Sequence, residues 1–502
     1  MKKLFFSLSL FLGLSQVDFA QKIDNLPEFK LSKLEAESQI RFLASDEMLG
    51  RRTGSVTNRL AARYLAESFR NLGLKPAPGQ TDYLQTVSMD LVKPIKKGTI
   101  VGGGDTLSIG KHFIAFGGYE ATNLDNKEVI FVGYGWKDDA KNYNDYKDID
   151  VKNKIVVVQI GTPDSKSPNE MFSAASQKRK IAQDNGAAGL IEIFAAPIPW
   201  QVVAGYFNGE SFALSDNKNT IKRLPHYWIN AQTAKGFKKD NLKSININVE
   251  AREKSPARTS NVVGVLEGTD PMLKNEYVIL SAHFDHVGVG KEGGNPYKED
   301  SIFNGTRDNA FGTVAVLQAA KALSVSKPKR SVLFIGFTGE EIGLLGSKFY
   351  AENPLIPLKN CVYNLNCDGA GYNDTTKITI IGLNRTDAKP EIEKASTAFG
   401  LTAIDDPAPE QGLFDRSDNV SFAAKGIPAP TFSPGFTKFD ADIGKYYHQA
   451  ADNPETANLD YLLKYCQAYS HLARLIADRQ AKPKWIAGDK YEKAFNELNA
   501  GK

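Results

Sequence analysis

Cysteine, net charge and long apolar runs are all scarce in this sequence. Its 502 residues include only three cysteines, Cys361, Cys367 and Cys466. An odd number of scattered cysteines argues against a disulfide framework and against a cysteine-rich zinc module. We expect all three to be small buried hydrophobic side chains, with a single disulfide as the alternative in an exported protein.

The charge balance and hydropathy exclude two classes of partner. Lys and Arg outnumber Asp and Glu by 62 to 58, the formal net charge is +4, and no dense Lys/Arg tract occurs. Nothing electrostatic therefore favours nucleic acid. After residue 20 no segment is long and apolar enough to cross a bilayer, so we expect no membrane span. The sequence does not indicate the oligomeric state.

The N-terminus has the pattern of a secretory signal peptide over residues 1–20. Lys2 and Lys3 form a positive start, Leu4–Leu14 is apolar, and Ala20 offers a small residue for cleavage. The apolar stretch is too short to span a bilayer. We therefore expect an exported protein, either periplasmic or secreted.

The chain is too long for one compact core, which favours two domains. Residues 105–251 contain short β-branched runs separated by turns rich in Gly, Asn and Asp, and predict an inserted β-rich domain. Residues 21–104 and 252–502 form the second, larger domain. Helices are predicted at 32–49 and 56–72, and from residue 259 strands alternate with helices. This alternation predicts an α/β fold whose mixed, largely parallel sheet has helices on both faces.

Histidine and acidic residues follow the ends of several apolar runs. Because the carboxyl ends of parallel strands meet at one edge of a sheet, we expect these side chains to lie close together. His283 and Asp285 follow the run 277–282, Glu340 and Glu341 follow 331–338, and Asp368 follows 361–366; Asp308 and His448 lie in loops. Each of these residues alone is more often a cap or a satisfied polar group. Several of them at one edge indicate a metal site.

Two histidines, two aspartates and one glutamate form a mixed nitrogen and oxygen set of candidate ligands that suits zinc. These five ligands are too many for one tetrahedral ion. If one carboxylate bridges, they would hold two ions about 3.5–4 Å apart, with a hydroxide between them as nucleophile. Of the consecutive pair, Glu341 can bind metal while Glu340 stays free as a general base. Asp285, two residues after His283, is placed to orient that imidazole.

At these motifs the sequence resembles the secreted co-catalytic zinc aminopeptidases, a metallopeptidase family that includes glutamate carboxypeptidase and glutaminyl cyclases. The likeness covers most of the mature chain and includes an N-terminal signature from Leu43-Ala-Ser-Asp through Arg51-Arg-Thr-Gly. Its other motifs are Ala282-His-Phe-Asp-His-Val-Gly, Asn304-Gly-Thr-Arg-Asp-Asn-Ala, Phe337-Thr-Gly-Glu-Glu-Ile-Gly-Leu-Leu-Gly-Ser, Asn364-Leu-Asn-Cys-Asp-Gly and Tyr447-His-Gln-Ala-Ala-Asp.

The resemblance implies roles for individual residues. His283 and Asp368 would bind one zinc ion, Glu341 and His448 the other, and Asp308 would bridge them. Glu340 would take a proton from the nucleophile and pass it to the leaving amine. The segment 105–251 is similar to the protease-associated domain that many relatives insert, through Val132-Gly-Tyr-Gly, Lys154-Ile-Val-Val-Val and Gly186-Ala-Ala-Gly-Leu-Ile.

Three residues depart from the family pattern. Arg307 stands where relatives often have Asp, Phe311 replaces a usually small residue, and Asn419 replaces the His of an Arg-Ser-Asp-His motif. We expect Arg307 to turn away into a surface salt bridge, because a guanidinium aimed at the metals would oppose their charge.

The function predicted from these observations is an exopeptidase with two Zn²⁺ ions that acts on peptides with a free N-terminus. Alternatives are a carboxypeptidase or glutaminyl cyclase of the same family, or a catalytically inactive receptor-like binding protein. Such an inactive relative would be expected to lose ligands, whereas this chain has the complete set. Loops 407–420 and 432–447 are predicted to shape the pocket for the cleaved residue, whose identity the sequence does not reveal.

Overall fold

The computed structural model describes residue 26 and residues 30–116, 120–215, 223–233, 235–238, 241–290 and 300–500. The predicted signal peptide, residues 1–20, therefore lies outside the described residues. Within the described part, no helix combines the length and the apolar character that a membrane crossing requires.

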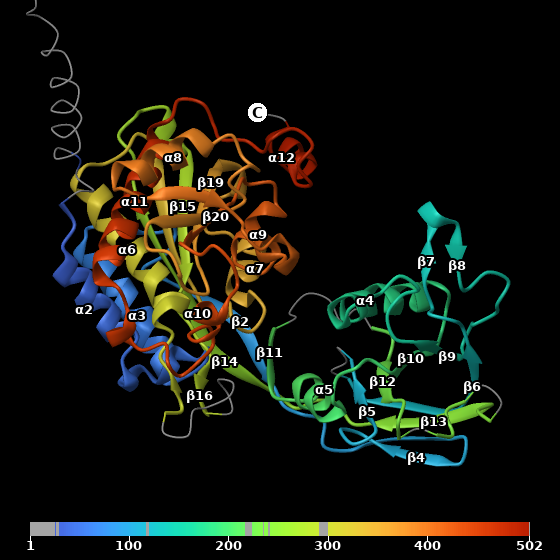
Figure 1. Cartoon of the computed structure of the whole chain (residues 1–502). Helices are drawn as coiled ribbons and strands as arrows, with labels where there is room; N and C mark the ends of the chain where they lie inside the picture. Colours follow the sequence, from blue (N-terminus) through green and yellow to red (C-terminus); the bar gives the residue numbers. More distant parts are fainter. Residues whose placement is uncertain are drawn as a thin grey trace, which may run out of the picture. The chain divides into compact units, whose positions relative to one another are not determined.

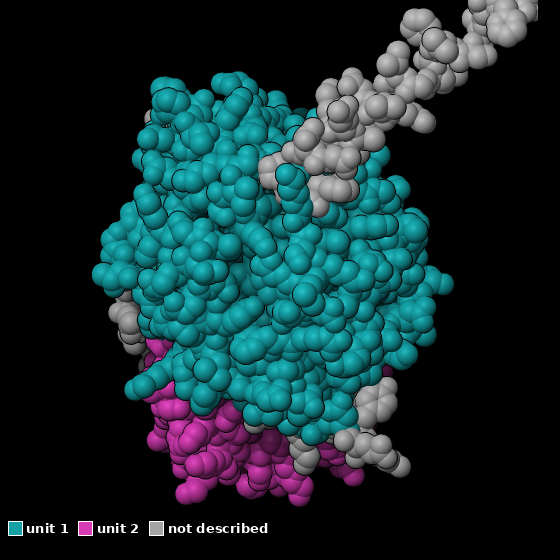
Figure 2. Space-filling model, turned by 90° about the vertical axis from the view of Figure 1, so that its left-hand side faces the viewer, with its two compact units in different colours: residues 1–88, 257–502 teal, residues 89–256 magenta. Residues whose placement is uncertain are grey.

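The chain folds into two compact units, coloured separately in Figure 2. Unit 1 comprises residues 1–88 and 257–502, and unit 2 comprises residues 89–256. Unit 2 begins before the predicted residue 105 because β3 (Gly98–Gly102) pairs with both β4 (Asp105–Ser108) and β13 (Ser244–Val249). The insertion is thus wider than the β-branched runs alone indicate.

Unit 2 is built on an eight-stranded sheet in the order β4-β3-β13-β6-β9-β10-β12-β5. The strands not yet bounded are β6 (Thr122–Phe131), β9 (Ile155–Gln159), β10 (Gly189–Phe194), β12 (His226–Asn230) and β5 (Phe113–Ala115). Two helices accompany them, α4 (Pro168–Asp184) and α5 (Trp200–Phe207). The β6–β9, β9–β10 and β10–β12 pairs are parallel.

Unit 1 is organised by a sheet in which β2-β14-β18-β15-β19-β22-β20-β21 are neighbours and β1 pairs with β14. Its strands are β1 (Lys75–Pro76), β2 (Leu84–Val92), β14 (Lys254–Leu266), β15 (Tyr277–His283), β18 (Ser331–Phe337), β19 (Cys361–Cys367), β20 (Lys377–Ile381), β21 (Thr402–Asp405) and β22 (Thr431–Pro434). The central strands β18, β15, β19 and β22 are mutually parallel. Their carboxyl ends therefore lie at one edge of the sheet.

Helices cover both faces of this sheet (Figure 1). On one face lie α2 (Lys33–Leu43), α3 (Val56–Asn71), α6 (Phe311–Val325), α8 (Lys389–Ala398) and α11 (Leu459–Asp478). On the other face lie α7 (Leu345–Glu352), α9 (Asn419–Ala423), α10 (Ala441–Gly444) and α12 (Glu492–Asn499). Because side chains alternate along a strand, Val278 and Leu280 of β15 enter the first core and Ile279 the second. The predicted α/β class is confirmed.

The predicted helix over residues 32–49 is wrong beyond Leu43. The helix begins at the cap Ser32 and ends at Leu43, and Asp46–Arg51 forms a 3-10 turn instead. Leu49, Gly50 and Arg51 have φ values of 45°, 63° and 48°, in the left-handed region that interrupts a helix. Gly50 is required there, because a Cβ would lie 2.5 Å from the carbonyl oxygens of Gly288 and Phe303. Tertiary contacts therefore override the helical pattern.

Candidate metal centre

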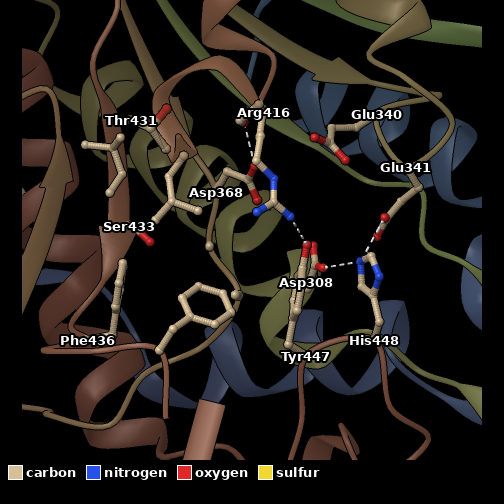
Figure 3. A pocket seen from close by; sticks show the side chains of 16 residues that line it. Asp308, Glu340, Glu341, Asp368, Arg416, Thr431, Ser433, Phe436, Tyr447 and His448 are labelled. Atoms are coloured by element: carbon tan, nitrogen blue, oxygen red, sulfur yellow. Dashed lines mark hydrogen bonds and ion pairs between the residues drawn. The ribbon is translucent and has the colours of Figure 1, made fainter. Parts of the chain in front are cut away.

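The predicted site residues meet at the carboxyl edge of the central strands (Figure 3). His283 is the last residue of β15, Asp368 directly follows β19, and Glu340 and Glu341 follow β18. Asp308 lies in a turn of π-helical type, η6 (Thr306–Ala310), between β15 and α6, and His448 lies in the loop after α10. Residues as far apart in the sequence as Asp308 and His448 thus line one pocket, and His283 lies next to Asp308.

Two groups of potential ligand atoms can be distinguished. In the first, the Nε2 of His283 lies 3.1 Å from an oxygen of Asp368 and 4.0 Å from an oxygen of Glu340. In the second, the Nε2 of His448 lies 3.1 Å from Asp308 Oδ2 and 3.0 Å from Glu341 Oε2. Within each group the ligand atoms lie within 4.8 Å of one another, and the second group also includes His286.

Asp308 connects the two groups. Its Oδ1 lies 3.3 Å from His283 Nε2, and its Oδ2 lies 3.1 Å from His448 Nε2. Each oxygen of one buried carboxylate thus faces a different imidazole. This is the arrangement needed for a carboxylate that bridges two ions.

The chemistry of the donor set fits zinc. Imidazole nitrogens and carboxylate oxygens are the usual non-thiolate ligands of this ion. In addition, His286 has a buried Nε2 without a hydrogen-bond partner among the described residues. Four carboxylates, those of Asp308, Glu340, Glu341 and Asp368, line one pocket, and like charges at such distances need cations to compensate them.

Protonation equilibria in this pocket are strongly perturbed. Burial raises the pKa of Glu340 well above its usual value, and the carboxylates of Asp368 and Glu341 raise it further, despite the opposing effect of His283. Burial also raises the pKa of Glu341, but His448 and His286 outweigh it and hold that pKa at about 2. Two adjacent glutamates therefore differ in proton affinity because only one faces two imidazoles.

The carboxylate of Asp285 lies closer to the backbone N–H of Glu340 than to the imidazole of His283. The Nδ1 of His283 lies 3.2 Å from the backbone carbonyl oxygen of Asp285 but 3.8 Å from its carboxylate. The carboxylate instead accepts the hydroxyl of Thr53 at 2.8 Å and the backbone N–H of Glu340 at 3.3 Å. The predicted contact to His283 is thus made through the main chain, and the carboxylate positions the residue expected to act as base.

Three supporting residues were not predicted. The Nδ1 of His286 lies 2.7 Å from Glu341 Oε1, and the hydroxyl of Ser417 donates to Asp368. Arg51 is fully buried and donates to the carbonyls of Leu43, Phe284, Asn304 and Gly305, so the N-terminal motif fastens the loops beside His283 and Asp308. A sequence signal existed for His286, which ends the same His-Phe-Asp-His motif as His283. The sequence contained no signal for the backbone carbonyls that Arg51 contacts.

The expectation for Arg307 is partly wrong. Its guanidinium does turn away from the ligands and pairs with Asp452, at 2.7 Å. The pair is not at the surface, however, because Arg307 is 3% exposed and Asp452 1%. Phe311, the second departure from the family pattern, packs in the core against the rings of Tyr372, Tyr461 and Tyr465.

A pocket opens beside the two ligand groups. Its apolar lining comes from a residue after β19, from the last residue of β20 and from the predicted loops 407–420 and 432–447, namely Ala370, Ile381, Leu413, Phe436 and Phe439. Thr431, Ser433, Arg416 and Tyr447 add polar groups, and the guanidinium of Arg416 lies 3.4 Å from the hydroxyl of Tyr447. The pocket can receive an apolar side chain next to the ligand groups.

Comparison with known proteins agrees with this site. Residues 261–473, from the second half of β14 to most of α11, match the model of peptidase family M28. All of the matched residues belong to the larger unit. The resemblance to metallopeptidases of this group is thereby confirmed over the matched residues, and His283, Asp308, Glu340, Glu341, Asp368 and His448 all lie within them.

Two relatives that match part of the chain are aminopeptidases. The chain is 26% identical over 258 residues to aminopeptidase YwaD of Bacillus subtilis, covering 50% of this chain and 53% of the relative. It is 27% identical over 235 residues to aminopeptidase Y of Saccharomyces cerevisiae, covering 44% of this chain and 39% of the relative. The chain thus spans about half or less of the length of these relatives.

One solved structure has a similar fold over most of this chain. An aminopeptidase from Aneurinibacillus sp. strain AM-1 superimposes with a TM-score of 0.56 at 20% identity, covering 90% of this chain and 95% of that one. At this identity the likeness concerns the fold alone.

Proposed function

We propose that the chain is a zinc-dependent aminopeptidase that removes the N-terminal residue of peptides. The observation that carries the proposal is Asp308, whose two oxygens face His283 and His448 at 3.3 and 3.1 Å, with Glu340 beside them. His283 and Asp368 would hold one ion, Glu341 and His448 the other, and Asp308 would bridge.

The protein's own residues supply the proton transfers and the positioning. When bound, two zinc ions would acidify a water between them and polarise the scissile carbonyl. Glu340 accepts a proton from the attacking water on a carboxylate oxygen and delivers it to the departing amine nitrogen. The carboxylate of Asp285 accepts the backbone N–H of Glu340 and so fixes the position from which the Glu340 side chain extends. The apolar lining formed by Ile381, Leu413, Phe436 and Phe439 receives the side chain of the cleaved residue.

Unit 2 is proposed to be a protease-associated domain that does not take part in the chemistry. Neither group of potential metal ligands includes any of its described residues. We also propose that residues 1–20 direct export to the periplasm or the medium.

The test is Glu340→Gln. Loss of a general base lowers kcat by about 10²–10⁴-fold, while zinc content should stay at the wild-type level because the proposed ligands remain. Glu352→Gln is the matched control, since the side chain of Glu352 is 66% exposed and pairs with Lys425, away from the pocket residues. Retained turnover by Glu340→Gln would refute the proposed role, and wild-type protein that binds no zinc would favour a receptor-like binding protein.

Carboxypeptidase action is the second candidate because of one residue. The guanidinium of Arg416 lines the pocket and can pair with a substrate carboxylate. Paired assays on N-acetylated and C-amidated peptides separate the two reactions. An aminopeptidase cleaves the amidated peptide and not the acetylated one, whereas a carboxypeptidase shows the reverse; a glutaminyl cyclase would release ammonia from an N-terminal Gln.

A further inference from the structure

Arg307 immediately precedes the bridging Asp308, but its side chain reaches in the opposite direction. One terminal nitrogen donates to Asp452 Oδ1 at 2.7 Å and to the hydroxyl of Thr456 at 2.7 Å. The other donates to the carbonyl of Thr456, also at 2.7 Å. The guanidinium also lies over the ring of Tyr446, 3.7 Å from its centroid. The guanidinium of Arg307 thus makes an ion pair, hydrogen bonds and a stacking contact at the same time.

These partners all belong to residues 446–456, the segment that carries His448, whereas the ring of Tyr372, whose centroid lies 5.1 Å from the guanidinium, is outside it. Tyr446 lies two residues before His448, and Asp452 and Thr456 follow it by four and eight residues. The backbone of the turn joins in, because the N–H of Arg307 donates to Asp452 Oδ2 at 2.8 Å and that of Thr306 to the carbonyl of Asp452 at 3.2 Å. The turn that carries Asp308 thus contacts residues on both sides of His448.

The position of His448 depends on contacts from other segments more than the positions of the other proposed ligands do. Its side chain is 36% exposed, against 1% for His283 and 6% for Asp308. It belongs to no strand, and its φ of 52° lies in the left-handed region that a β-substituted residue adopts only when its surroundings impose it. Tyr447, stacked on its ring, is part of the same loop. Contacts from outside the loop must therefore set its position.

We propose that Arg307 is a positioning residue that sets His448 against Asp308 and so controls the affinity of the second metal position. This inference rests on the proposed function, in which Glu341, His448 and the bridging Asp308 would hold one of two zinc ions. The charge of the guanidinium is compensated by Asp452. Arg307 therefore acts through geometry and not by repelling cations.

The decisive measurement is zinc stoichiometry and affinity in Arg307→Met and Arg307→Lys, using buffered free zinc and a chromophoric chelator. Loss of groups that support ligands costs about 10–100-fold in metal affinity. We expect one zinc ion per chain to bind as in wild type and the other to bind about 10–100-fold more weakly in Arg307→Met. Arg307→Lys, which keeps the charge next to Asp452 but not the contacts to Thr456, should fall between. Tighter binding in Arg307→Met would overturn the inference in favour of a charge effect.

Hydrogen exchange supplies a second measurement that does not depend on turnover. In zinc-loaded protein, Arg307→Met should speed exchange of the backbone N–H groups of residues 444–456 and leave β15 protected. The control Arg330→Met removes an equally buried arginine, paired with Glu276 Oε2 at 2.9 Å, at the opposite end of β18. It should lower stability without changing zinc affinity.

The possible results separate the two proposals. Two zinc ions of unchanged affinity in Arg307→Met refute the positioning role and leave the proposed function intact. Equal weakening of both ions, in this variant and in Arg330→Met, indicates general destabilisation and also refutes it. Wild-type protein without zinc refutes the proposed function and this inference together. If Arg307→Met does not fold, Arg307→Lys and Asp452→Asn carry the same test.

Discussion

A buried charge network in unit 2 should dominate the stability of that unit. Glu192 of β10 is fully buried and accepts from Lys178 of α4, from His226 Nε2 at 2.8 Å and from Trp228 Nε1 at 3.0 Å. Lys178 is buried as well and also donates to the carbonyl of Gln159 at 2.6 Å. Removing one member of such an ion pair leaves the other charge uncompensated, which costs about 3–5 kcal/mol.

We therefore predict that Lys178→Met and Glu192→Gln each destabilise unit 2 by about 3–5 kcal/mol. The double variant should be more stable than either single one, because no charge is then buried and the Gln amide oxygen still accepts from Trp228. Urea unfolding reports this through tryptophan emission, since Trp136, Trp200 and Trp228, three of the four tryptophans, lie in unit 2. Additive effects of the two substitutions would refute the reasoning.

The same network predicts a pH dependence. Burial lowers the pKa of His226 below its ordinary value, so the unfolded chain takes up a proton that the folded unit resists. Burial raises the pKa of Glu192, but His226 and Lys178 outweigh it and the net shift is downward. For both groups the unfolded state binds more protons on acidification. Stability should therefore fall as pH drops below about 6.5 and fall further below about 4.3, the unperturbed values for His and Glu; a constant unfolding free energy from pH 7 to 4 would contradict this.

Two further predictions concern the metal centre. Removing zinc with a chelator should abolish turnover. It should also lower the free energy of unfolding by about 4 kcal/mol per site relative to zinc at 1,000 times its Kd, because zinc that binds only the folded state stabilises it by mass action; an unchanged melting temperature would count against metal binding. Thr53→Val removes the hydroxyl that Asp285 accepts at 2.8 Å, and we expect kcat to fall about tenfold at unchanged zinc content, since small misplacements of catalytic groups cost up to about 100-fold. Thr397→Val, at an exposed helical position, is the control, and equal rates for both variants would refute the role of Thr53.

Much of the fold follows from local pattern. Strands β15 and β18 are largely apolar, and β15, β18 and β19 are buried along almost their whole length, as expected for strands covered on both faces. The error at residues 32–49 arose because the turn 46–51 is imposed by Arg51 and Gly50, which contact loops more than 200 residues away. No local pattern encodes those partners.

The sequence by itself determined which residue types stand at the carboxyl ends of the central strands. His283, Glu340, Glu341 and Asp368 follow apolar runs, and parallel strands bring such positions to one edge. Tertiary structure alone decided how these side chains are oriented and supported. Asp308 faces two imidazoles, His286 adjoins Glu341, Asp285 holds the N–H of Glu340, and Arg307 turns from the ligands to Asp452. The physical reason is that the direction of a long polar side chain depends on acceptors supplied by distant segments. Spacing along the chain therefore locates a site, but packing defines its geometry.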